Sequence, residues 1–297
     1  MELFLQRVLD GAGNGAIYAA MALAIVLVFI STGTLNFALG AMGMFCVFFA
    51  WWLVEGSGWS LPLPLAVGAA ILLGFLGGGA LERIFIRPFS DSHDHLPIII
   101  VTLGIWLALE PLAGVLFSHE SETLPSIFPA GSVSAGGVYI TYGQIGLLGS
   151  VAVIGLALYV VFQKTRVGLA MRASVDNSLS ARLSGISHSR MMMLGWAMAG
   201  SLAASAGILI APTTLVSTGM LNNTLLLGFA AAALGGFTSV VGALVGGLIM
   251  GLLESLAPAY VPFLGADLAL LTAFTVLIGV LLFKPSGLFG TEEIERV

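Results

Sequence analysis

Residues 15–30 read GAIYAAMALAIVLVFI, a run that carries no charge and almost no polarity. An α-helix needs about 20 predominantly apolar residues to cross the roughly 30 Å hydrocarbon core of a bilayer. This run fills most of such a segment, and comparable runs recur along the chain. They lie at about 11–31, 35–54, 61–81, 97–117, 144–163, 191–211, 224–240, 241–256 and 266–283.

The composition of the whole chain points the same way. Of 297 residues, 58% are hydrophobic and only 8% are charged, and the mean hydropathy is +1.07. Soluble domains carry about 25% charged residues. A soluble surface with so few charges would expose large apolar patches, whereas a lipid-facing surface should be apolar. The sequence therefore predicts an all-α, polytopic membrane helical bundle with about eight to nine transmembrane segments, forming one domain over 1–297.

Some of these segments are predicted to be broken or re-entrant. The runs at 224–240 and 241–256 are short, and Gly235–Gly236 lies between them. The sequence around Asn36 also interrupts an apolar stretch. Nine full spans and eight full spans with one partial span are both compatible with this pattern.

Glycine pairs with the GxxxG spacing occur in three of the predicted helices: Gly74/Gly78, Gly242/Gly246 and Gly247/Gly251. Two glycines at this spacing lie on one helix face and let a second helix approach closely, which drives helix association in lipid. In a chain with 39 glycines such pairs also arise by chance.

The lysines and arginines predict the orientation. Five of the ten lie between residues 164 and 190, two more follow the third run, and Lys284 begins the tail. Because Lys and Arg concentrate in cytoplasmic loops, residues 82–96, 164–190 and 284–297 are expected inside. Residues 118–143, which contain Glu120 and Glu122 but no Lys or Arg, and residues 212–223 are expected outside. The side of the N-terminus is left open.

Residues 164–190 form the most informative polar segment, because apolar residues recur in it at helical spacing among its charges. We expect a short helix over 168–186 lying along the membrane surface. Three interpretations remain open for it: a docking element for a cytoplasmic partner, a lipid-surface anchor, and a solvated connection.

Residues for catalysis or for nucleotide binding are missing from the sequence. The phosphate-binding pattern GxxxxGK[ST] does not occur, so ATP would have to be hydrolysed on another chain. Glu110 lies either within the membrane or near the outer surface, and Glu254 and Asp267 lie near helix ends; for each, an interfacial position is favoured over ion coupling. The cluster His93-Asp94-His95 is expected to be solvated on its charged loop, so we predict neither a metal site nor a cofactor on this chain, and no enzyme activity.

Polar residues inside the apolar runs either line a path or hydrogen-bond between helices. Asn36 is the strongest candidate for a path, because the neighbouring Gly33-Thr34-Leu35 would break the helix and expose backbone groups.

Four stretches resemble the branched-chain amino acid ABC transporter permeases of the LivH type. The first combines NGAIYA (14–19) with LNFALG (35–40), and the second combines LER (81–83) and RP (87–88) with IVTLG (100–104). The third is GLAMRA (168–173) with Asp176, Ala181 and LSGI (183–186). The fourth combines LGGF (234–237), Gly242-Ala243 and Gly246-Gly247 with KPSGLFG (284–290).

The resemblance implies a permease in the bacterial cytoplasmic (inner) membrane that works with a second permease subunit, two cytoplasmic ATP-binding subunits and an extracytoplasmic solute-binding protein, with ATP on the partner subunits. It implies that the third stretch is the loop where the ATPase docks. The expected coupling residues are Gly168, Arg172, Ala173, Asp176, Ala181 and Gly185, and the expected translocation path includes Asn36, Gly40 and Thr102.

Two departures from the family pattern lie near the second run. Leu39 stands where the family often has His, and Ala41 stands where a polar or acidic residue is usual. The resemblance therefore implies a branched-chain or other hydrophobic amino acid as the solute, with urea, short amides or aromatic acids as alternatives. An ion-coupled secondary carrier and an intramembrane enzyme or scaffold are the rival classes.

Overall fold

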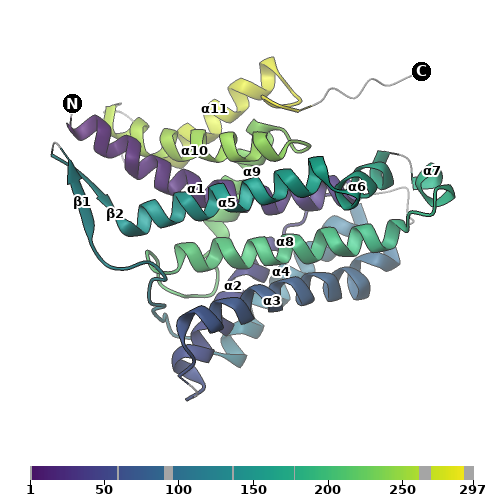
Figure 1. Ribbon diagram of the computed structural model, residues 1–297, viewed down its shortest axis with the longest axis horizontal. Coiled ribbons are helices and arrows are strands. Elements are labelled where there is room, and N and C mark those ends of the chain that lie inside the picture. The colour runs from purple at the N-terminus through teal and green to yellow at the C-terminus, as the bar shows by residue number, and fades with distance from the viewer. Residues whose placement is uncertain are drawn as a thin grey trace. The chain divides into compact units, whose positions relative to one another are not determined.

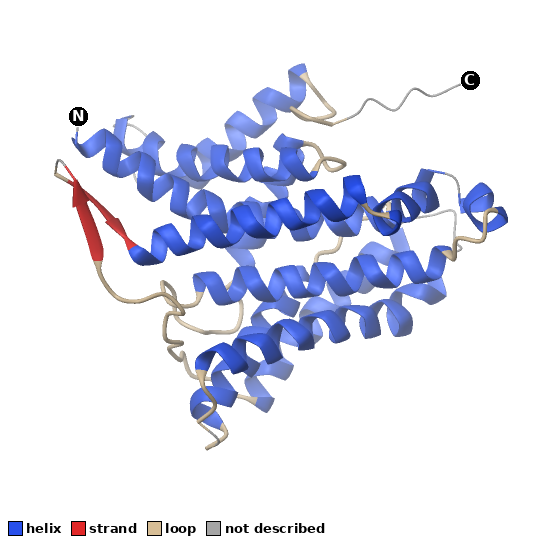
Figure 2. Cartoon of the chain, viewed as in Figure 1, coloured by secondary structure: helices blue, strands red, loops and turns tan. Residues whose placement is uncertain are grey.

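The computed structural model describes residues 2–58, 60–89, 96–135, 137–176, 178–260 and 269–290, and these residues are mostly helical (Figures 1 and 2). The long helices are α1 (Glu2–Thr32), α3 (Leu63–Leu81), α4 (Leu96–Leu116), α5 (Tyr142–Lys164), α8 (His188–Ile210) and α10 (Val240–Tyr260). The shorter ones are α2 (Leu39–Trp51), α6 (Arg166–Asp176), α7 (Ser178–Leu183), α9 (Asn222–Gly235) and α11 (Ala269–Phe283). The prediction of an all-α polytopic bundle is confirmed.

The expected eight to nine complete spans are not confirmed by the described residues. Seven of the described helical segments are long and apolar enough to cross a membrane. One of them is α2 extended by the π-helix η1 (Trp52–Gly56), and another is α3 extended by η2 (Glu82–Ile86) and the 3₁₀ turn η3 (Arg87–Phe89). At 1.5 Å per residue, the 14 residues of α9 cover only about 21 Å. The run at 224–240 therefore contains a helix that stops partway across.

The chain divides into two compact units, each assembled from separate parts of the sequence. Unit 1 contains Met1–Val26, Phe128–Leu158 and Leu226–Val297, and unit 2 contains Leu27–Ile127 and Tyr159–Leu225. Neither unit is a continuous stretch of chain. The single domain over 1–297 stays a prediction.

Glycines bring the helices of unit 2 into close contact. A Cβ built on Gly74 of α3 would lie 2.5 Å from the carbonyl oxygen of Gly200 in α8, and one on Gly78 would clash with the carbonyl oxygen of Trp196. The same holds for Gly43 of α2 and the carbonyl of Ala203. The spacing Gly74/Gly78 therefore marks a helix contact and is not a chance occurrence.

In unit 1 the other two glycine pairs also lie at contacts. Gly247 faces Ala19 of α1, Gly251 faces Gly15, and Gly246 faces the carbonyl of Ala231 in α9. Helix α10 can thus approach α1 on one side and α9 on another, because its contact positions lack side chains.

The partial helix α9 ends on the tail of the chain. The N–H groups of Leu288 and Phe289 donate to the carbonyl oxygens of Leu234 and Gly235, at 2.8 and 2.9 Å. The last carbonyls of a helix have no partner within the helix. In a helix that stops inside a bilayer they need one from elsewhere in the protein, and the tail after Lys284 supplies it.

A β-hairpin lies between α4 and α5 in the chain. The sequence pattern did not predict this hairpin. Strand β1 (Ser132–Ala135) pairs antiparallel with β2 (Val138–Thr141), with Val133 opposite Ile140. The hairpin also binds α1, since Gln6 donates to the carbonyl oxygen of Tyr139 at 3.1 Å and accepts from its N–H at 3.0 Å. The N-terminal end of α1 therefore lies beside a segment that the charge pattern assigns to the outside.

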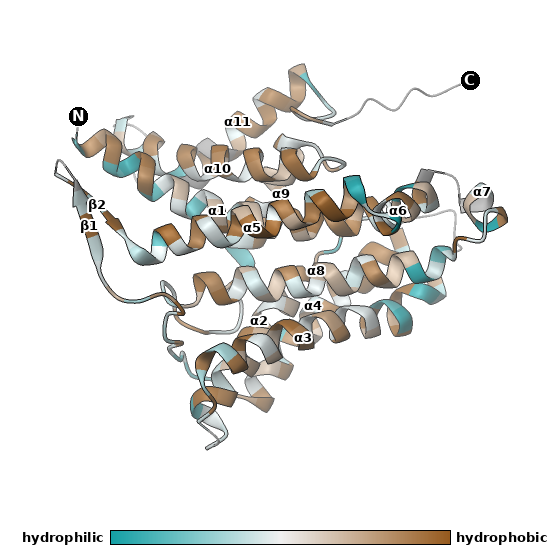
Figure 3. Cartoon of the chain, in the orientation of Figure 1, coloured by the Kyte–Doolittle hydropathy of each residue, from teal (hydrophilic) through white to brown (hydrophobic). Residues whose placement is uncertain are grey.

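Segments that the charge pattern assigns to one side contact each other in unit 2. On the predicted outer side, Glu122 and Val216 form an antiparallel bridge. On the predicted inner side, Arg87 donates to the carbonyl oxygen of Ser189. Hydrophilic residues gather at the ends of α3, α5 and α8 near α6 (Figure 3).

The α3–α8 contact gives a direct test of the glycine packing. Gly78→Ala should destabilise the protein by about 1–3 kcal/mol, because the new methyl group meets backbone that cannot move aside. Gly77→Ala is the matched control: a Cβ there has nothing within 4 Å, and the higher helix propensity of Ala should leave stability equal or raised by up to about 1 kcal/mol. Thermal unfolding in detergent measures both, and equal midpoints for the two variants would contradict the packing.

Candidate functional site

Two helices are described within the segment 164–190, where one short helix over 168–186 was expected. Helix α6 ends at Asp176 and α7 begins at Ser178. Asn177, between them, lies outside the described residues. We call α6 and α7 together the α6–α7 element.

Helix α6 starts immediately after α5 and is fastened to it. The hydroxyl oxygen of Thr165 accepts the N–H of Gly168 at 3.3 Å, which is the bond of an N-cap residue to the third helical position. A Cβ on Gly168 would clash with the backbone of Phe162 near the end of α5. The glycine is needed because α6 turns directly across the end of α5.

Arg172 strengthens this junction. Its Nη2 donates to the carbonyl oxygen of Phe162 at 3.0 Å, one of the last carbonyls of α5 that lack a partner within the helix. A cation at this end also complements the helix dipole. Its Nε is buried and finds no hydrogen-bond partner in the described part of the chain. Arg172 thus positions α6 against α5.

The other side of α6 faces α8. Met171 and Ser174 are fully buried, and a Cβ on Gly195 of α8 would lie 3.4 Å from Met171 Cε. A ring nitrogen of His188, in the first turn of α8, lies 3.1 Å from the carbonyl oxygen of Ser174. Helix α6 is therefore held between the end of α5 and the start of α8. The expected coupling residue Ala173 is half-buried on this helix.

Gly185 ends α7 in a Schellman motif. It has φ +82°, its N–H donates to the carbonyl of Arg182 at 3.0 Å, and the N–H of Ile186 donates to the carbonyl of Ala181 at 2.9 Å. These are the two bonds that define the motif, and glycine is favoured because its backbone is left-handed there. Ala181 is buried. Two of the expected coupling residues, Ala181 and Gly185, therefore form the turn that ends α7.

Several apolar side chains of the α6–α7 element are exposed. Leu169 is 62% exposed and Leu183 is 83% exposed, and Val167 and Val175 are also exposed. Arg166 and Arg182 lie on the same element and are exposed as well. Exposed apolar side chains can mark interaction sites, and on this element exposed basic residues occur in the same two helices.

The expected path residues are all buried in unit 2. The side-chain oxygen of Asn36 accepts the N–H of Ala38 at 2.8 Å, an Asx turn that leads into α2. Gly40 lies in α2 with Leu225 and Leu221 nearby. Thr102 lies in α4, which packs against α2, and its hydroxyl donates to the carbonyl of Ile99 at 2.8 Å. Their part in translocation stays a prediction. Leu39 and Ala41, the departures from the family pattern, are buried beside them.

Two of the carboxylates within the spans, Glu110 and Glu254, have hydrogen-bond partners. Glu110 accepts from Trp106 Nε1 at 2.8 Å and from Asn222 Nδ2 at 3.0 Å. In unit 1, the hydroxyl of Tyr18 donates to Glu254 at 2.5 Å. The described residues contain no group of three potential metal ligands. Asp267 and His93-Asp94-His95 lie outside the described residues.

Comparison with known proteins decides the family. Residues 7–283 match the family described as the branched-chain amino acid transport system permease component. The chain belongs to this family. The permease is 30% identical to the high-affinity branched-chain amino acid transport system permease LivH of Escherichia coli K12, and the match covers 99% of this chain and 98% of LivH.

Two further relatives carry similar names. The permease is 29% identical to BraD of Pseudomonas aeruginosa, with 99% of this chain and 98% of that protein covered. It is 28% identical to a probable LivH of Methanocaldococcus jannaschii, over 92% of this chain and 88% of that one. The match therefore extends over both units.

The Schellman motif predicts the effect of changing Gly185. Gly185→Ala should cost the permease about 1–2 kcal/mol at this turn, because a Cβ disfavours the left-handed backbone, whereas Gly185→Asn should cost less. Hydrogen exchange measured at the amides of Gly185 and Ile186 should be fastest in the Ala variant and intermediate in the Asn variant. Equal exchange in all three proteins would contradict the assignment.

Proposed function

We propose that this permease is the membrane-spanning subunit of an ATP-binding-cassette importer that carries branched-chain or other hydrophobic amino acids. The observation that carries the proposal is the α6–α7 element, with an inward side packed on α5 and α8 and an outward side that exposes Leu169 and Leu183. The names of the relatives support the solute class. The seven span-length helices fit a multi-pass membrane protein.

The element suits docking better than the other two interpretations. A solvated connection would not keep two leucines exposed next to buried Met171 and Ala181. The match to the permease component of a transport system favours a protein partner over a lipid anchor. The exposed leucines would give a partner apolar contacts, and exposed Arg166 would give it an ion pair.

Docking at this element would pass motion directly into the membrane. ATP binding and hydrolysis on the partner subunits would displace the α6–α7 element. Because α6 contacts the end of α5 through Gly168 and Arg172, and the start of α8 through Ser174, both helices would follow. A population shift between outward-open and inward-open states results when ATP favours one of them.

The proposed assembly contains a second permease subunit, two cytoplasmic ATP-binding subunits and an extracytoplasmic solute-binding protein. The solute would cross between the two permeases along buried residues that include Asn36, Gly40 and Thr102. If the α6–α7 element faces the cytoplasm, the hairpin β1–β2 faces the compartment of the binding protein. The N-terminal end of α1 would lie on the same side, because Gln6 and Tyr139 join it to the hairpin.

The test is reconstitution of the complete complex in liposomes with radiolabelled leucine. We expect the ATP-binding subunit to copurify with the permease, and leucine uptake to require both ATP and the binding protein. Phenylalanine, urea and acetamide in parallel reactions identify the solute class. Uptake by this chain alone, driven by an ion gradient without ATP, would contradict the proposal and favour a secondary carrier.

A further inference from the structure

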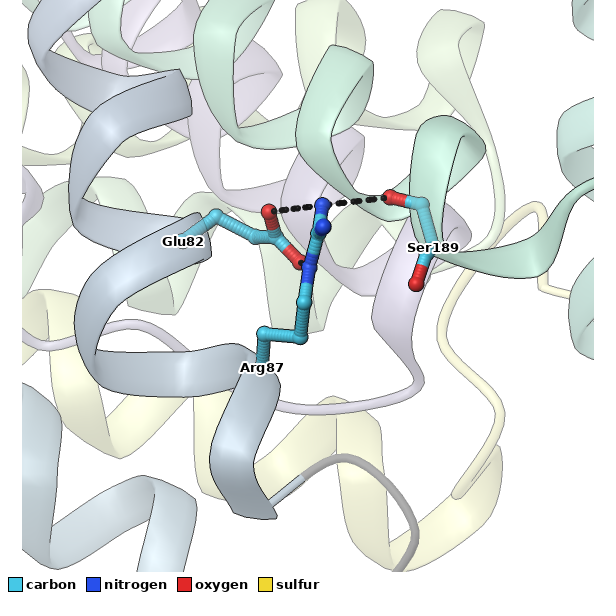
Figure 4. Close-up of polar contacts among 3 residues, drawn as sticks. All are labelled: Glu82, Arg87 and Ser189. Atoms are coloured by element: carbon cyan, nitrogen blue, oxygen red, sulfur yellow. Dashed lines mark hydrogen bonds and ion pairs between the residues drawn. The ribbon is translucent and has the colours of Figure 1, made fainter.

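Glu82 and Arg87 form an ion pair at the end of α3 (Figure 4). Arg87 Nη2 lies 3.1 Å from Glu82 Oε2, and Nε lies 3.5 Å from Oε1. The Glu82 side chain is fully buried, whereas that of Arg87 is 32% exposed. A buried carboxylate needs such a partner, and the planar fork of Arg fits it with two nitrogen atoms.

The local backbone makes this pairing possible. Residues five apart do not face each other on an α-helix, where neighbours on one face are three or four apart. Here the helix widens into the π-helix η2 (Glu82–Ile86), and the N–H of Arg87 donates to the carbonyl of Glu82. This wider turn brings residues i and i+5 to the same side. The π-helix thus serves to place Arg87 over Glu82.

Arg87 also reaches a second helix. Its Nη2 donates to the carbonyl oxygen of Ser189 at 3.4 Å, and Ser189 lies in the first turn of α8. Figure 4 shows the guanidinium group between Glu82 and Ser189. One side chain therefore connects the end of α3 to the start of α8.

The neighbouring residue His188 connects the same turn of α8 to α6 through the carbonyl of Ser174. Further along, α3 and α8 are in backbone contact at Gly74 and Gly78. A displacement of α6 would therefore meet the start of α8 at a point that is tied to α3. The pair Glu82–Arg87 completes a continuous set of contacts from α6 to α3.

We propose that Glu82 and Arg87 are positioning residues for energy coupling. They join α3 to the start of α8, which is also where α6 contacts α8. Both α3 and α8 would therefore move with the α6–α7 element. The inference rests on the proposed function, because it requires a partner ATPase that displaces this element. Loss of the pair should leave ATP hydrolysis in place and reduce the solute transported per ATP.

The test compares Arg87→Gln and Arg87→Lys in the complete reconstituted complex, with Arg83→Gln as the matched control. Arg83 is exposed and belongs to the same π-helix, so its replacement removes a charge from the same turn. Lysine keeps a charge beside Glu82 but lacks the fork that lets Arg87 bind the carboxylate and Ser189 together. ATP hydrolysis and leucine uptake are measured on the same vesicles.

We expect both Arg87 variants to lower leucine transported per ATP by about tenfold, as for the loss of an allosteric coupling between sites, and Arg83→Gln to match the wild type. If the Arg87→Gln permease does not assemble into the complex, the result for Arg87→Lys alone tests the proposal. If Arg87→Lys transports as much leucine per ATP as the wild type, the proposal is overturned. A positive charge beside Glu82 would then be enough for coupling, without the contact to Ser189. Absence of ATP-driven uptake by the wild-type complex would instead refute the proposed function.

Discussion

Close backbone contact at glycine holds the helices of this protein together. Lipid chains are as apolar as leucine, so helices in a bilayer gain little from burying apolar side chains against one another and associate through close packing instead. In unit 2, Gly74 and Gly78 bring α3 against the backbone of α8, and in unit 1, Gly247 and Gly251 bring α10 against α1. Helices in such contact are hard to separate, because packed interiors rearrange between discrete states and do not deform continuously.

This close packing determines which helices would move together when α6 is displaced. The α6–α7 element touches α5 through Arg172 and Gly168 and touches α8 through Ser174. Because α8 is in backbone contact with α3, a push at α6 would move a group of helices and not one helix end. The same packing would let a displacement of α6 by a partner subunit reach α3 as well.

The sequence predicted the positions of the seven span-length helices of the described residues, because hydropathy summed over about 20 residues is a strong signal, although it gave eight to nine spans. It also located the α6–α7 element through its Lys and Arg residues. It could not predict the hairpin, whose strands are only four residues each, or the support of α9 by Leu288 and Phe289, about fifty residues later. Glu82 and Arg87 were visible as a motif, but their pairing depends on a π-helix that no local pattern announces. Asn36 stood out as a helix breaker, and its Asx turn explains the break.

The central claim is that the α6–α7 element lies on the cytoplasmic side and is covered by a separate ATPase. The most direct measurement is labelling with a membrane-impermeant thiol reagent after Cys46, the single cysteine, is replaced by Ser. Leu169→Cys should react in inside-out vesicles and not in intact cells, and bound ATPase should suppress the reaction; Ser134→Cys in the hairpin should show the opposite sidedness. Labelling of Leu169→Cys in intact cells, or labelling that the ATPase leaves unchanged, would contradict the account.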